Sequence, residues 1–193
     1  FRKVILDEVR RGKRFVLIVG GGATCRAYQE ALRNVVPANH ETLDWLGIHA
    51  TVLNAQFVRL LFGKYAYEEV VMNPTKRIKT NKPIIIGSGW KPRSSSDKDA
   101  ILAAKTYGAK EVLNLSNILY VYNKDPKKYK NAKPLRDLTW RAYLKMFGTG
   151  WKPGKSTPFG PPAAKEAKRL GITVKILDGR RLEELKRAMR SEK

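Results

Sequence analysis

The chain has 193 residues, 42% of them hydrophobic, and a formal net charge of +22, from 39 Lys and Arg against 17 Asp and Glu. This length and composition predict one globular domain over residues 1–193, and the single cysteine, Cys25, excludes an internal disulfide framework. No apolar run approaches the roughly 18 to 20 residues of a membrane-spanning helix, and the charged start is not signal-like, which excludes a membrane protein and predicts a cytoplasmic one.

In the first part of the chain, amphipathic patterns alternate with short apolar runs. Pro37 stops one predicted helix, and Thr42 is the expected cap of the next, which has a long apolar face. The elements expected here are helices over 3–11, 23–35 and 42–62 and strands over 15–19 and 69–72.

The same alternation continues to the end of the chain. A strand begins at Glu111 and runs into its exit loop by Tyr122. The other elements expected here are strands over 83–87 and 172–177 and helices over 97–107, 137–147, 162–170 and 181–190. Strands that alternate with helices predict an α/β fold, a three-layer αβα sandwich with a mainly parallel sheet, whose ligands bind at the carboxyl ends of the strands.

Glycines at 20–22 follow the apolar strand 15–19 directly. Without side chains, their N–H groups can approach a phosphate beside the positive end of the next helix. An ordinary strand-to-helix turn explains the same pattern equally well. The segment also lacks the spacing of a dinucleotide fingerprint or a P-loop, so the phosphate site stays a hypothesis.

Other predicted strands are followed by polar loops. Small hydroxyls and an aspartate at 94–97 can hydrogen-bond a phosphate or a sugar at a helix start, and Ser116 and Asn117 follow the strand that begins at Glu111. Asp125 offers a carboxylate for a ribose hydroxyl, although Asp-Pro is also a common turn. His40 and His49 stand alone, so no metal site is predicted.

The positive charge attracts anions, among them nucleotides and nucleic acid. However, the basic residues are spread along the whole chain, as expected of solvated helix faces and loops. Specific nucleic-acid binding is therefore possible but not favoured.

The order of the loops resembles the amino acid kinase superfamily, and within it the uridylate (UMP) kinases. Segments VLIVGGGATCRAY and DWLGIHATVLNAQ resemble a nucleotide loop and the pattern D-x-x-G-M-x-A-T-x-x-N-A. GSGWKPRSSSDKDAILAA resembles G-T-x-P-x-x-T-T-D-x-x-A, and NLSNILYVYNKDP resembles the adenine loop T-K-V-D-G-V-Y-x-x-D-P. TPFGPPAAKEAKRLGITVKIL resembles the late D-P-x-A-A-K helix and its strand, so the likeness covers almost the whole chain.

The resemblance implies transfer of the γ-phosphoryl group of ATP to UMP, with Mg²⁺, in a homo-oligomer that is often a hexamer. It implies that Arg26 and Asp97 are catalytic. The implied UMP-binding residues are Gly21, Asp44, Ser95 and Ser96. The implied ATP-binding residues are Gly22, Ser116, Asn117, Tyr122 and Asp125.

The sequence departs from the family pattern in three places. It starts after the family's first strand and glycine loop, which carry an active-site lysine. Leu119 and Tyr120 replace an Asp-Gly, Asn117 replaces the usual lysine, and Gly160 replaces an aspartate. Because phosphoryl transfer depends on charge stabilisation, such losses weaken catalysis. Two hypotheses stay open: a UMP kinase with impaired turnover, or a catalytically silent, basic nucleotide- or RNA-binding or structural assembly protein.

Overall fold

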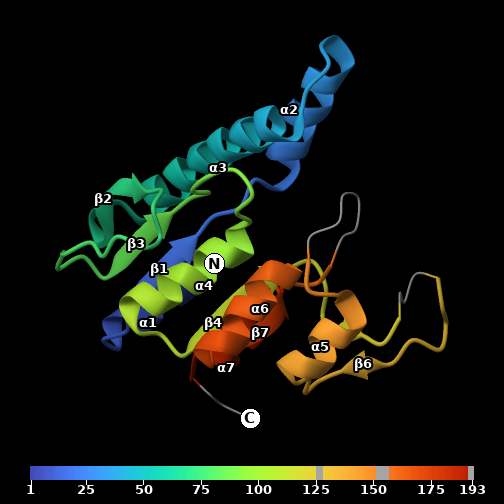
Figure 1. Cartoon of the computed structure of the whole chain (residues 1–193). Helices are drawn as coiled ribbons and strands as arrows, with labels where there is room; N and C mark the ends of the chain where they lie inside the picture. The colour runs from blue at the N-terminus through green and yellow to red at the C-terminus, as the bar shows by residue number, and fades with distance from the viewer. Residues whose placement is uncertain (125–127, 151–156, 191–193) are drawn as a thin grey trace. The chain divides into compact units, whose positions relative to one another are not determined.

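The computed structural model describes residues 1–124, 128–150 and 157–190. Within them the chain forms two compact units, Phe1–Tyr107 and Gly108–Lys193. The prediction of a single domain is not tested by this division and stays a prediction. Figure 1 shows the elements of both units along the chain.

The first unit is organised around a parallel three-stranded sheet in the order β1-β3-β2. All four residues of the central strand β3 are buried, as its run of isoleucines predicts for a strand covered on both faces. The elements of the first unit are α1 (Arg2–Arg10), β1 (Phe15–Ile18), α2 (Gly22–Val35), α3 (His40–Phe62), a 3₁₀ turn (Gly63–Tyr65), β2 (Ala66–Val71), β3 (Ile84–Gly87) and α4 (Ser96–Tyr107).

Helices cover both faces of this sheet. Helix α3, with α2 packed beside it, lies against β2 and β3, and α4 lies against β1 on the opposite face (Figure 1). The layers are thus helix, sheet and helix, which confirms the predicted αβα sandwich with parallel strands.

The second unit holds a parallel pair of strands, β4 and β7, paired from Glu111–Thr173 to Ser116–Asp178. Between them an antiparallel hairpin of β5 and β6 precedes two helices, α5 and α6, that pack on each other. The bounds are β4 (Glu111–Ser116), β5 (Val121–Tyr122), β6 (Pro134–Leu135), α5 (Trp140–Phe147), α6 (Pro161–Leu170), β7 (Thr173–Asp178) and α7 (Leu182–Arg190).

Several sequence predictions need correction. The helix predicted over 137–147 begins at Trp140, because Thr139 is its N-cap. Thr42 does not cap α3: the cap is Asn39, whose side-chain oxygen accepts a hydrogen bond from the Thr42 backbone N–H at 2.8 Å. The second strand begins at Ala66 rather than at 69. The exit loop after β4 contains the short strand β5, which was not predicted because its residues show too little alternation to mark a strand.

Candidate functional site

Two helices begin side by side at the carboxyl edge of the first unit's sheet. Helix α2 follows β1 and α4 follows β3, and these neighbouring parallel strands end together, with Ile18 paired to Gly87. An added Cβ on Gly20 would lie 3.5 Å from Oγ of Ser96. The turn after β1 therefore lies against the start of α4, and the positive ends of two helix dipoles share one edge.

The start of α2 is suited to an anion. Gly21 is the N-cap without a side-chain hydrogen bond, and the first turn holds no acidic residue. Gly22 has φ +59°, a conformation that side chains rarely adopt, which explains a glycine there. Arg26 is exposed one turn further along the helix. Open N–H groups, a helix dipole and a cation at one helix start together favour a bound phosphate.

Helix α3 holds this edge in place through polar side chains on one face. The Nδ2 of Asn54 donates to the carbonyl oxygens of both Gly20 and Gly21 at 3.0 Å. The Oγ1 of Thr51, which is buried, accepts from the N–H of Gly89 at 2.7 Å. Because the carbonyl oxygens of Gly20 and Gly21 accept hydrogen bonds from Asn54, α3 holds the turn after β1 in place.

Neither Thr51 nor Asn54 was predicted as a site residue, although a signal for both was present. They follow Asp44 by seven and ten residues, which is a helical spacing that places all three on one face. Both also match fixed positions of the pattern D-x-x-G-M-x-A-T-x-x-N-A.

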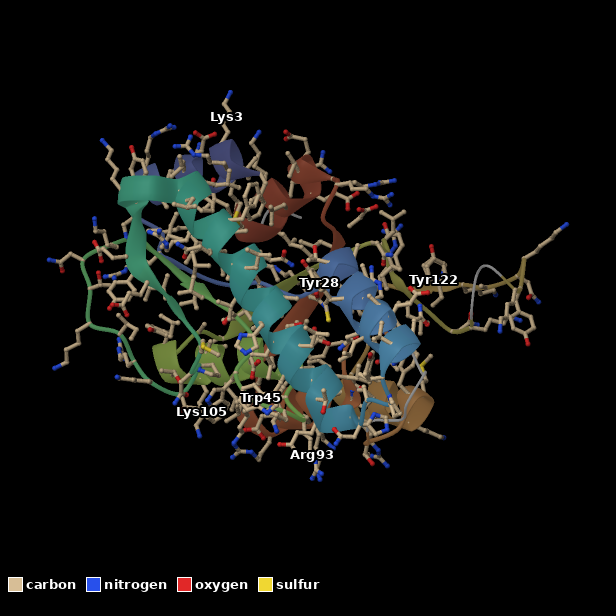
Figure 2. The ribbon with its side chains drawn as sticks, turned by 90° about the horizontal axis from the view of Figure 1, so that it is seen from above. Lys3, Tyr28, Trp45, Arg93, Lys105 and Tyr122 are labelled. Atoms are coloured by element: carbon tan, nitrogen blue, oxygen red, sulfur yellow. The ribbon has the colours of Figure 1, made fainter. Side chains whose placement is uncertain are left out.

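The loop between β3 and α4 is held by carboxylates. Asp44, predicted to contact the UMP ribose, accepts a hydrogen bond through Oδ2 from the N–H of Arg93 at 2.9 Å. Arg93 has φ +64°, the one positive φ outside glycine among the described residues. Figure 2 shows Arg93 and Trp45 at the same end of α3. Asp44 thus fixes a strained loop residue with one of its oxygens.

The remaining predicted residues of this unit form the first turn of α4. The Oγ of Ser95 accepts from the N–H of Lys98 at 3.3 Å, and Ser96 and Asp97 are the first helical residues. The structure therefore brings together the predicted acceptor-side and catalytic residues on one edge. These are Gly21, Arg26, Asp44, Ser95, Ser96 and Asp97, and Gly22, which is predicted to bind ATP, lies beside Gly21 on the same edge.

The predicted ATP-binding residues other than Gly22 belong to the second unit. Ser116 ends β4, and its carbonyl oxygen accepts from the N–H of Gly179 at 2.8 Å. Asn117 is exposed in the bend that follows, and Tyr122 lies on the hairpin, where its ring meets Tyr120 edge-on at 6.5 Å. Asp125 lies outside the described residues.

An ion pair stands beside Ser116 at the end of β7. Asp178 is 4% exposed and accepts from Arg180 through both oxygens, at 2.9 and 2.7 Å. These hydrogen bonds lower the pKa of Asp178 to about 2. The pair keeps a carboxylate ionised at this strand end.

Two further findings concern the described residues alone. They hold no group of three His, Cys, Asp or Glu side chains placed to bind a metal ion. None of their helices is long and apolar enough to cross a membrane. A cytoplasmic location stays a prediction.

Residues 1–178 match the amino acid kinase family. The uridylate kinase of Pyrobaculum calidifontis is 30% identical over 183 residues, covering 94% of this chain and 84% of that protein. The uridylate kinase of Sulfolobus acidocaldarius is 33% identical over 190 residues, covering 95% and 82%.

Solved structures show the same likeness. The uridylate kinase of Archaeoglobus fulgidus superposes with a TM-score of 0.84 at 25% identity, over 100% of this chain and 87% of that one. The UMP kinase of Bacillus anthracis has a TM-score of 0.76 at 17% identity, over 99% and 81%, and supports the fold alone. The chain belongs to the amino acid kinase family and is similar to its uridylate kinases, as the order of its loops predicts.

Proposed function

We propose that the chain is a nucleoside monophosphate kinase of the uridylate kinase type, which transfers the γ-phosphoryl group of ATP to UMP. One observation carries the proposal: the starts of α2 and α4 meet at one strand edge, with Arg26 on α2 and Asp44 on the adjoining α3. Relatives named uridylate kinase support the choice of acceptor.

The chemistry would rest on position and charge. N–H groups at the start of α2 and the hydroxyls of Ser95 and Ser96 would hold the UMP phosphate, and Arg26 would neutralise charge as it develops. Mg²⁺ would enter with ATP, since this cation is commonly held by substrate phosphates with one or two carboxylates. Asp97, in the first turn of α4, would lie beside the acceptor phosphate, as the resemblance implies.

The proposal also assigns residues to ATP, the phosphoryl donor. Ser116 and Asn117, at the end of β4, would hold ATP together with Tyr122. Tyr122 would pack against the adenine ring, as an aromatic side chain with a polar tip can. Asp125 is assigned to the ribose by resemblance alone.

The acceptor site is tested by titrating UMP into Arg26→Ala and into a matched control, Arg33→Ala. Arg33 is exposed in the last turn of the same helix, on the same face and about 10 Å further along it. A hydrogen bond to a charged group contributes about 1.5–3 kcal/mol, so Arg26→Ala should weaken UMP binding at least about tenfold. Equal affinities of the two variants would contradict the proposal.

We also propose that the chain associates with itself through α3. Its outer face exposes Leu53, Phe57 and Leu60 by 59%, 63% and 63%, and no residue of the adjoining α2 is buried. Figure 2 shows Tyr28 and Trp45 on these two helices. Such an apolar face is typical of an interface between copies, in a dimer or a hexamer.

A further inference from the structure

Asp99 is a fully buried carboxylate that the proposed reaction does not use. It lies in the first turn of α4 and is 0% exposed. It falls two positions after Asp97, where the pattern T-T-D-x-x-A sets no residue type. Burial raises the pKa of Asp99, so the charged form is costly at this position.

Both oxygens of Asp99 bind the loop that leads into α4. Oδ1 accepts from the hydroxyl of Ser94 at 2.6 Å, and Oδ2 accepts from the N–H of Trp90 at 3.2 Å. The two donors are four residues apart, so a single side chain closes the loop 90–94 on itself. Asp44 binds the same loop from α3 through Arg93.

The position of this loop matters for the acceptor site. It ends at Ser95 and Ser96, where α4 begins beside the turn after β1. A buried charge stabilises a fold poorly compared with an apolar residue, but it selects one arrangement of its partners.

We infer that Asp99 is a positioning residue for the acceptor: it holds the loop 90–94 so that Ser95 and Ser96 face the phosphate of the bound nucleotide. The inference rests on the proposed function, because it assigns a role within that site. Asp99 itself does not touch the nucleotide. Its loss should therefore weaken UMP binding and leave ATP binding unchanged.

The test measures UMP and ATP affinity by calorimetry for the wild-type chain, Asp99→Ala and Asp99→Asn. Alanine removes both acceptor oxygens, so the arrangement of the loop 90–94 that presents Ser95 and Ser96 is no longer favoured. Because apparent affinity falls with the fraction of chains in the binding-competent arrangement, we expect UMP affinity to fall at least about tenfold. Asparagine keeps one acceptor oxygen, so Asp99→Asn should lose less UMP affinity than Asp99→Ala. If Asp99→Ala does not fold, Ser94→Ala removes one of the two contacts and leaves the buried residue in place.

The control is Thr106→Val, near the other end of α4. The hydroxyl of Thr106 donates to the carbonyl oxygen of Pro74 at 2.8 Å, so it anchors a different loop to the same helix. This variant should bind UMP within about twofold of wild type, because the hydrogen bond that it removes lies away from the site.

Hydrogen exchange gives a second readout. The amide of Trp90 should exchange faster in Asp99→Ala, while amides of the central strand β3 should stay protected. Equal loss of protection throughout the unit would show a purely structural role and overturn the inference. Unchanged UMP affinity in Asp99→Ala would overturn it too and leave the proposed function standing. A wild-type chain that binds no UMP would refute the proposed function, and the inference with it.

Discussion

Gly21→Ala should disturb the start of α2 more than its small size suggests. A Cβ added at Gly21 would lie 2.4 Å from Cβ and 3.1 Å from Sγ of Cys25. Carbon atoms in contact are normally about 3.5–4.0 Å apart, so the overlap exceeds about 1 Å. The Cβ of Cys25 is attached to the backbone of α2 and cannot turn away, so the helix start itself must move.

The cost of this variant is purely steric. Gly21 has φ −75° and ψ −27°, which alanine adopts without strain. Overpacking of this kind costs about 1–3 kcal/mol, and the severe overlap places Gly21→Ala near the upper end. The shift would also move the N–H groups that we assign to the UMP phosphate.

Gly22→Ala is the matched control because its cost comes from backbone strain rather than from steric overlap. An added Cβ meets nothing within 4 Å, but φ is +59°, so alanine would be strained by about 1–2 kcal/mol. Urea denaturation should rank Gly21→Ala as the less stable variant, and calorimetry should show that it loses more UMP affinity. A Gly21→Ala chain as stable as wild type would refute the steric reasoning.

Three further predictions concern other parts of the chain. Phe57→Asp should convert a self-associated protein to monomer, because a charge on the apolar face of α3 opposes burial of that face. Light scattering at micromolar concentration measures the change in mass, and a wild-type chain found only as monomer would contradict the proposed interface. The stability that the pair Asp178–Arg180 contributes should be fully present above the ordinary aspartate pKa of 3.8 and lost as the pH falls through about 2. In Arg180→Gln the pKa of Asp178, measured by NMR titration, should rise toward 3.8. An unchanged pKa would exclude the ion pair as the cause of the shift. RNA should bind weakly, without sequence preference, and lose orders of magnitude in affinity between about 50 and 200 mM salt; tight binding that persists at the higher salt would favour a specific RNA function.

The order of elements was predictable because each has a strong local signal. The isoleucines of β3 are buried on both faces, and Gly12, with φ +87°, follows α1, as a glycine placed after a helix predicts. Thr42 was chosen as a cap although Asn39, a better cap residue, stands three positions earlier. The hairpin of β5 and β6 depends on pairing between segments that are each two residues long, which no local pattern marks.

The place of the candidate residues in the fold was predictable, whereas their hydrogen bonds were not, and their roles stay predictions. Resemblance brought Gly21, Arg26 and Asp44 to one edge, as the structure has them. It did not show that Asp44 bonds to Arg93, because that contact spans 49 residues and depends on a positive φ. Asp99 was missed since a charged residue in an exposed-looking helix start is usually solvated.

The most direct test of the proposed function is phosphoryl transfer by the full chain. Purified protein is incubated with Mg-ATP and, in parallel, with UMP, CMP, AMP or GMP, and products are separated by anion exchange. With UMP as acceptor we expect UDP and ADP in equal amounts, and with the purine acceptors we expect little transfer. Arg26→Ala should lower kcat/KM for UMP at least about tenfold, because it removes a charge-assisted contact. Wild-type protein that binds UMP and ATP but forms no UDP would contradict the kinase assignment and favour a silent nucleotide-binding member of the family.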